Sequence, residues 1–169
     1  MMRVHIRAAQ ATDMDIVTEI YGRSVVEDIA SFELTPPDRD EMIRRWEFLQ
    51  DGGFPYLVGT IDNEVAGFAY AGPYRPRKAY RHTVENTVYV SANHRKKGVA
   101  FALMQSLVEQ CQQTGFKQML GVIALEQEES INNSVKLHQK LGFSNQGRLR
   151  AVGQKFDRWL DVVFMQREL

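Results

Sequence analysis

The 169-residue sequence is poor in cysteine and has no excess of charge of either sign. A single cysteine excludes a disulfide framework and any metal site built from several thiolates. The 21 basic residues balance the 21 acidic ones, so the chain lacks the overall field that attracts nucleic acid or an anionic membrane. We therefore expect neither partner, and we expect a cytoplasmic protein in which Cys111 fills core on an apolar helix face.

The sequence also lacks long apolar runs. No stretch approaches the roughly 20 apolar residues that span a bilayer, and residues 1–7 contain no apolar signal region. We find no repeat, low-complexity tract or inter-domain linker. Length and these absences together predict a single domain over residues 1–169, with enough chain to bury a core.

Hydrophobic periodicity predicts strands and helices that alternate along the chain. The expected strands lie at 3–9, 56–61, 65–70, 83–90, 119–125, from 143 onward and at 158–169. The expected helices begin at 12–15, at a Thr35 cap, near 100 and at 132–134. The order β-α-α-β-β-β-α-β-α-β-β is typical of an α/β protein with much antiparallel sheet.

A basic loop, residues 94–98, joins the expected strand at 83–90 to an amphipathic helix. The start of a helix leaves backbone N–H groups unpaired and partly positive, which suits a phosphate. Gly98 removes the Cβ that would keep a ligand away from those amides. The loop lacks the glycine patterns of nucleotide-triphosphate and dinucleotide sites. A plain turn with solvated lysines is the alternative.

Arg95, Gly98 and Ala100 have the spacing of the pyrophosphate-binding signature of the GNAT superfamily of N-acetyltransferases, which this loop resembles. Four further stretches, 74–75, 81–90, 137–143 and 153–161, resemble its phosphinothricin N-acetyltransferase subgroup. The resemblance covers nearly the whole chain, in order. It implies a GNAT fold, with a mixed, mostly antiparallel central sheet flanked by helices. It also implies acetyl-CoA as acetyl donor, no metal, and a small amine such as phosphinothricin or methionine sulfoximine as acceptor.

The resemblance places the coenzyme on two segments. The backbone of the strand would pair with the pantetheine arm as an added strand does, and the Val90 amide would donate to the oxyanion. The amides of the loop would hold the pyrophosphate, with lysine charge nearby. The residues implied are Val88, Tyr89, Val90, Lys96, Lys97, Gly98, Val99, Ala100 and Phe101.

One position departs from the family. The subgroup usually has an asparagine three residues before the helix serine, where it contacts the pantetheine, and this chain has Ile131 there. The chain is also longer between Leu125 and Ser134. We expect Asn133 or Asn132 to supply the contact from a shifted loop.

Transfer of an acetyl group to an amine needs a base that removes the amine proton, and it gains from an acid near the departing thiol. Glu85 is the candidate base, since a carboxylate inside a β-branched strand is unusual unless it has a partner. The resemblance implies a glutamate here that is the base or contacts the substrate. An exposed edge-strand carboxylate is the alternative. His138, on an apolar helix stripe, is either a satisfied core histidine or, as the resemblance implies, an acid toward the departing thiol or a contact to it.

Arg75, Pro76 and Arg77 precede the Glu85 strand. Arginine pairs well with carboxylate and phosphinate, so this segment is a candidate substrate site beside the base; solvated loop charges are the alternative. The activity predicted is direct acetyl transfer to a small amino-acid-like amine. Acetylation of a protein N-terminus or another amine, and an acyl-CoA sensor without turnover, are the alternatives. The subgroup also implies a homodimer.

Overall fold

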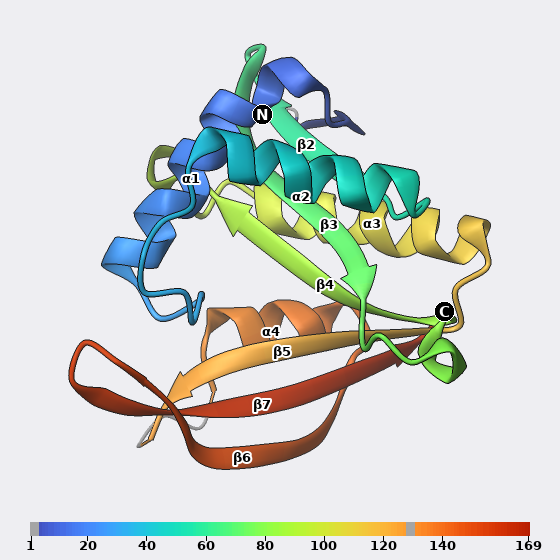
Figure 1. The fold of residues 1–169 in the computed structure, drawn as a ribbon. Coiled ribbons are helices and arrows are strands. Elements are labelled where there is room, and N and C mark those ends of the chain that lie inside the picture. The colour runs from blue at the N-terminus through green and yellow to red at the C-terminus, as the bar shows by residue number, and fades with distance from the viewer. Residues whose placement is uncertain (1–3, 128–130) are drawn as a thin grey trace.

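In the computed structural model, residues 4–127 and 131–169 are described, and their elements follow the predicted order (Figure 1). The prediction of an α/β protein is therefore confirmed. The strands are β1 (His5–Ala8), β2 (Tyr56–Ile61), β3 (Glu64–Pro73), β4 (Thr83–Val90), β5 (Gln118–Glu126), β6 (Ser144–Lys155) and β7 (Arg158–Glu168). The helices are α1 (Met14–Glu27), α2 (Arg39–Asp51), α3 (Val99–Thr114) and α4 (Asn133–Lys140).

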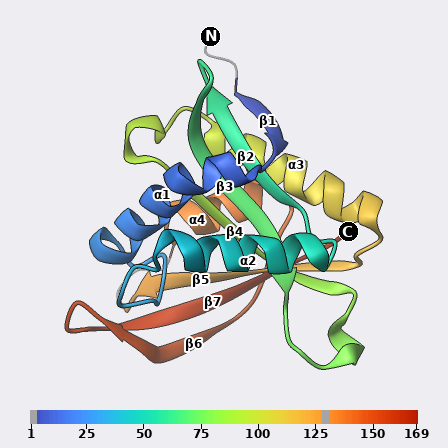
Figure 2. The same cartoon turned by 45° about the horizontal axis from the view of Figure 1, so that its top comes forward.

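One sheet holds the seven strands in the order β1-β2-β3-β4-β5-β7-β6. Every neighbouring pair is antiparallel except β4 and β5, which are parallel. This is the mixed, mostly antiparallel sheet that we expected. Helices α1 and α2 cover one face of its first half and α3 covers the other (Figure 2).

The start of α2 differs from the prediction. Helix α2 begins at Arg39, and Asp38 caps it by accepting a 2.8 Å hydrogen bond from the Glu41 N–H group. Thr35 is therefore not the cap. The reason is that Thr35 and Pro36 each precede a proline, and a residue before proline is pushed out of the helical region.

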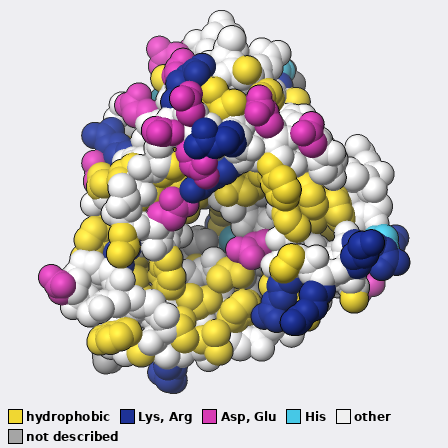
Figure 3. All heavy atoms as spheres, viewed as in Figure 1, with side chains coloured by type: hydrophobic (Ala, Val, Ile, Leu, Met, Phe, Trp, Pro, Cys, Tyr) yellow, Lys and Arg dark blue, Asp and Glu magenta, His cyan; other side chains and the backbone are white. Residues whose placement is uncertain are grey.

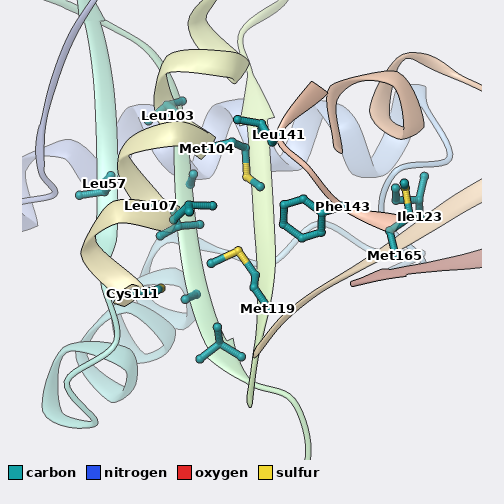
Figure 4. Packing of buried hydrophobic residues seen from close by; sticks show 14 of the residues in the cluster. Leu57, Leu103, Met104, Leu107, Cys111, Met119, Ile123, Leu141, Phe143 and Met165 are labelled. Atoms are coloured by element: carbon teal, nitrogen blue, oxygen red, sulfur yellow. The ribbon is translucent and has the colours of Figure 1, made fainter. Parts of the chain in front are cut away.

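The larger apolar core lies between α3 and the sheet (Figure 4). The face of α3 that the sequence predicted to be apolar is fully buried at Leu103, Met104 and Leu107. Cys111 ends this row, and burial raises the pKa of its thiol to about 12. As the sequence predicted, Cys111 therefore fills core, where its thiol stays protonated.

Strands β4 and β5 are paired over only part of their length. The parallel register joins Thr83 to Gln118, Val84 to Met119 and Glu85 to Leu120. Beyond these pairs the two strands diverge (Figure 1), and β5 continues against β7. The sheet therefore opens within itself just after Glu85.

Candidate active site

The opening between β4 and β5 holds a cavity of about 660 Å³. Figure 3 shows the molecule hollowed at the centre of this face, with hydrophobic side chains gathered below the hollow over β5, β6 and β7. The cavity walls come from β4 (residues 85–89), β5 (residues 122–124), the loop after α1 (residues 28–33) and α4. Segments distant in the sequence thus meet where the ladder of hydrogen bonds ends.

Glu85 lies at the point where β4 leaves β5. Its side chain is half-buried, and it lines both the central cavity and a second one of about 490 Å³ beneath α2, which Tyr70 and Thr87 also line. Burial raises the pKa of its carboxyl group. No lysine or arginine of residues 4–127 and 131–169 forms an ion pair with it. A carboxylate with a raised pKa and no cationic partner suits a general base.

His138, from α4, also lines the central cavity and is 2 % exposed. Its Nδ1 is 2.8 Å from the Ser134 carbonyl oxygen, and its Nε2 is 3.0 Å from Oδ1 of Asn86. The pKa of the ring is lowered, because burial lowers it more than the bond to Ser134 raises it. Both ring nitrogens are therefore engaged by protein oxygens, although the ring borders the cavity.

The loop before α3 keeps its backbone donors available. Gly98 caps α3 in the left-handed region at φ 80°, and the first bond into the helix runs from the Ala102 N–H group to the Gly98 carbonyl, at 3.0 Å. Within the described chain, no protein oxygen accepts from the N–H groups of residues 96–101. Nothing lies within 4 Å of a Cβ built on Gly98. These open amides at a helix start form the kind of cradle that binds phosphate.

The strand segment 88–90 lies between the cavity and this loop. The side chains of Val88 and Val90 pack on the α3 core, whereas Tyr89 faces α1, where its ring meets the Tyr21 ring edge-on at 5.1 Å. The side chains therefore anchor the segment to both layers. Its backbone, past the end of the pairing with β5, is left to meet a ligand.

The two candidate asparagines have different surroundings. Asn132 caps α4, because its Oδ1 accepts from the Val135 N–H group at 3.0 Å and its Nδ2 donates to the Ala124 carbonyl at 3.0 Å. Asn133 begins α4 and its side chain is exposed. Both polar ends of Asn132 are thus used within the protein, which leaves Asn133 the freer of the two.

Arg75, Pro76 and Arg77 are exposed and do not line the central cavity. The Arg75 guanidinium lies 5.1 Å from the centre of the Tyr74 ring and 5.8 Å from that of Tyr80. The structure therefore does not bring these residues together with Glu85 in the central cavity. They follow Pro73, which borders the cavity beneath α2.

The sequence analysis missed Glu33, in the loop that forms one wall of the cavity. Glu33 accepts hydrogen bonds from the Tyr21 hydroxyl at 2.8 Å and from Arg45 at 2.6 Å. Burial raises the pKa of Glu33, but these two bonds outweigh burial and lower it. Periodicity gave no signal here, because residues 28–33 are neither helix nor strand.

The hairpin of β6 and β7 supports the same loop from the other side. Lys155 is 4 % exposed and donates from Nζ to the Ser31 carbonyl at 2.6 Å. The Phe32 ring packs against Gly153 so closely that a Cβ there would lie 2.3 Å from it. These contacts join positions more than 100 residues apart in sequence, so pattern analysis of single segments could not find them.

Neither a membrane span nor a metal cluster is found in the part of the chain that the structure describes. None of its helices is both long enough and apolar enough to cross a bilayer. No group of at least three histidine, cysteine, aspartate or glutamate side chains is arranged to hold a metal ion.

Known proteins resemble this chain over nearly its full length. It is 41% identical over 165 residues to a phosphinothricin N-acetyltransferase of Streptomyces viridochromogenes, covering 98% of this chain and 87% of that protein. It is 36% identical over 169 residues to an L-methionine sulfoximine/L-methionine sulfone acetyltransferase of Pseudomonas paraeruginosa, covering 99% and 96%.

A solved structure of the same kind of enzyme resembles this chain in fold as well as in sequence. A phosphinothricin acetyltransferase of the GNAT superfamily from Sinorhizobium meliloti, in complex with acetyl-CoA, superimposes with a TM-score of 0.94 and 42% identity, covering 99% of this chain and 89% of that one. The expected GNAT fold is therefore confirmed. The model of the Acetyltransferase (GNAT) family matches residues 21–143, and the chain belongs to that family.

Proposed function

We propose that this chain is an acetyl-CoA-dependent N-acetyltransferase that acts on the amino group of a small amino-acid-like substrate. Phosphinothricin and methionine sulfoximine, the substrates named for its relatives, are the first candidates. The observation that carries the proposal is Glu85, a half-buried carboxylate with a raised pKa and no cationic partner where β4 leaves β5. One domain over residues 1–169 would carry the activity.

The residues present fit acetyl-CoA. The open amides of residues 96–101, beginning at Lys96 and including Lys97, Val99 and Phe101, would hold the pyrophosphate. The backbone of 88–90 would pair with the pantetheine arm, and Asn133 would contact it from the start of α4. Bound there, acetyl-CoA supplies the acetyl group as a reactive thioester.

Glu85 would take the proton from the attacking amine, directly or through a water molecule. The raised pKa makes this carboxylate a stronger base than one in water. Because it borders two cavities, the amine has room to approach from the α2 side. Arg75, Pro76 and Arg77, just past Pro73, would then contact the carboxylate or phosphinate of the substrate. His138 would act at the thiol side of the cavity.

A thiol-release assay with acetyl-CoA tests the proposal. Phosphinothricin, methionine sulfoximine, methionine sulfone, the L-amino acids and short peptides would be compared as acceptors. We expect the highest kcat/KM for a sulfoximine or phosphinothricin and little turnover of peptides. Preference for peptides would favour an N-terminal acetyltransferase, and coenzyme binding without thiol release from any acceptor would favour a sensor; either result would overturn the proposal.

We also propose that the protein is a homodimer. Strand β6 forms the exposed edge of the sheet, and four large apolar side chains of the β6–β7 hairpin are about half exposed: Leu149, Val152, Phe156 and Trp159. Light scattering would give the mass of a dimer, and Trp159→Glu would give a monomer. Val26→Glu, an equally exposed valine on α1, is the matched control and should stay dimeric.

A cytoplasmic location completes the proposal. It is supported by the lone cysteine, Cys111, which is free and buried, so the fold needs no oxidising compartment. Fractionation of cells that express the tagged chain would test it, and recovery with the membrane or the exported proteins would contradict it.

A further inference from the structure

The side chain of Asn86 bridges the first gap beyond the paired part of β4 and β5. It is 8 % exposed, and its Nδ2 donates to the Leu120 carbonyl oxygen at 2.9 Å. Leu120 is the last residue of β5 that pairs with β4. A carbonyl oxygen can only accept, so the NH₂ group of Asn86 must face it. The Oδ1 of Asn86 is thereby turned toward Nε2 of His138, at 3.0 Å.

The histidine ring therefore has an oxygen acceptor at each nitrogen. The Ser134 carbonyl, 2.8 Å from Nδ1, lies one helical turn earlier in α4, where it also accepts the backbone N–H group of its own helix. Among the described residues, Oδ1 of Asn86 has no donor other than Nε2. A ring without a proton on Nε2 would leave a lone pair facing Oδ1 and would leave that buried oxygen unsatisfied.

We propose that Asn86 is a positioning residue that keeps a proton on Nε2 of His138, at the wall of the cavity. The proposal deepens the acetyltransferase function proposed above and rests on it for its consequence, although the proton itself is a property of the unliganded protein. In the unliganded protein the Nε2 proton is bonded to Oδ1 of Asn86, so a thiolate that enters the cavity takes the proton in place of that oxygen, whereas the other neutral tautomer would present only a lone pair.

The ring has no freedom to avoid this arrangement. A Cβ built on Gly121 would lie 2.6 Å from Nε2 and 2.7 Å from Cδ2 of His138, so only glycine leaves room for the ring there. On another side the Phe143 ring meets the imidazole edge-on at 4.9 Å. Gly121, Phe143 and Asn86 together hold the imidazole in one orientation. Of the three, Asn86 is the residue that favours a proton on Nε2.

Two variants of Asn86 separate the acceptor from the packing. Asn86→Leu keeps the approximate size of the side chain and removes both hydrogen bonds. Asn86→Asp keeps an acceptor toward Nε2 but sets a carboxylate oxygen against the Leu120 carbonyl in place of the donor, so it restores only the contact with His138. Nitrogen NMR of the unliganded protein, labelled in its four histidines, distinguishes a protonated from an unprotonated ring nitrogen. His138→Gln identifies the signals of His138.

At neutral pH we expect a protonated Nε2 in the parent protein and in Asn86→Asp. In Asn86→Leu we expect the proton on Nδ1 alone, bonded to Ser134. An unprotonated Nε2 in the parent protein, or the same His138 signals in the parent and in Asn86→Leu, would overturn the proposal. If Asn86→Leu fails to fold, the parent spectrum alone still decides.

Kinetics then distinguish positioning from general destabilisation. With the best acceptor, we expect Asn86→Leu to lower kcat about tenfold, to leave the KM for acetyl-CoA within about twofold, and to be partly rescued by Asp. Gln118→Leu is the matched control, since it removes a 2.7 Å side-chain bond to Gln166 from the paired end of β5. It should keep the parent kcat. A fall in kcat that Asp does not rescue would contradict the proposal, whereas absence of turnover in the parent protein would count only against the acetyltransferase function.

Discussion

The two halves of β4 differ although they belong to one strand. Residues 83–85 pair with β5 in an ordinary parallel register, and Val84 is completely buried there. Residues 86–90 pair only with β3, and residues 86–89 line the cavity. The first half contributes mainly to stability, whereas the second leaves backbone and side chains free to meet ligands.

The point where the halves meet carries the polar residues. Glu85 and Asn86 are neighbours, so their side chains leave the strand on opposite faces. Glu85 borders both cavities, while Asn86 closes the end of the ladder by bonding Leu120 and His138. The difference between the two halves of β4 shows that the cavity forms because the pairing of β4 with β5 ends at Glu85. The unpaired Leu120 carbonyl is satisfied by a side chain rather than by the next strand.

The largest expected effect comes from the carboxylate at this point. Glu85→Gln keeps the shape of the side chain and removes its ability to accept a proton. We expect kcat to fall about 100-fold or more near neutral pH, since general bases contribute on that scale. Steady-state kinetics with acetyl-CoA and the best acceptor measure it, and calorimetry should show retained coenzyme binding. Equal rates in the variant and the parent would remove Glu85 from the mechanism.

A matched pair of valines tests the two halves directly. Val84 and Val88 lie on the same face of β4, four residues apart, and both contact the α3 core. Val84→Ala should lower the free energy of unfolding by about 2 kcal/mol, the cost of two buried methyl groups and the space they leave. Its KM for acetyl-CoA should not change. Chemical denaturation and kinetics would measure both.

Val88 is only half-buried and lines the cavity. We therefore expect Val88→Ala to cost less stability than Val84→Ala and to raise the KM for acetyl-CoA instead. Equal losses of stability with unchanged KM in both variants would mean that the halves of the strand do not differ in the way described.

A pair of glycines gives a smaller effect. Gly98 and Gly115 cap the two ends of α3, both in the left-handed region, at φ 80° and φ 95°, with nothing within 4 Å of an added Cβ. Valine at either position therefore carries similar backbone strain. Gly98→Val should weaken acetyl-CoA binding about tenfold, because the strain falls in the amide cradle. Gly115→Val should lose comparable stability with unchanged coenzyme affinity.

Calorimetric titration with acetyl-CoA compares the two variants at a temperature where both are folded. Coenzyme affinity that is the same in Gly98→Val as in Gly115→Val would count against the assignment of residues 96–101 to the pyrophosphate. Thermal denaturation of both variants supplies the matching measure of strain.

Local patterns were sufficient for the elements and for part of the site. The β-branched run of β4 and the apolar stripe of α3 predicted both elements, and the loop between them followed from Gly98. An acid inside a β-branched strand drew attention to Glu85. Asn86 gives the same signal, a buried polar side chain within that strand, but its partners on β5 and α4 are set by the fold.

The rest of the site depends on contacts that no local pattern contains. The loop at 28–33 takes its shape from Tyr21, Arg45 and Lys155, which lie on three other elements. Glu85 and Asn86 have low strand propensity at the point where the pairing of β4 with β5 ends, but no local pattern identifies β5 as the strand that diverges there. The α2 start was misplaced at Thr35 because the cap signal was weighed without the restriction that Pro36 and Pro37 impose.

The smallest effect, on stability, concerns Glu85 again. Its pKa is raised by burial, so above the ordinary carboxyl pKa the folded protein binds more protons at this group than the unfolded chain does. Stability therefore falls as pH rises through the raised pKa, and at neutral pH the charged, desolvated carboxylate destabilises the fold. Glu85→Gln removes that cost.

We expect Glu85→Gln to raise the melting temperature at pH 7 and the gain to vanish below the ordinary carboxyl pKa of about 4.3, where the carboxyl group is neutral in both states. Thermal denaturation of the parent and the variant across this range measures it. Glu64→Gln, which replaces an exposed glutamate on β3, is the control. A variant that is less stable than the parent at pH 7 would mean that the carboxylate is stabilised where it lies. In that case the charged Glu85 would not lower the stability of the fold. The two halves of β4 would then differ only in how accessible they are to ligands.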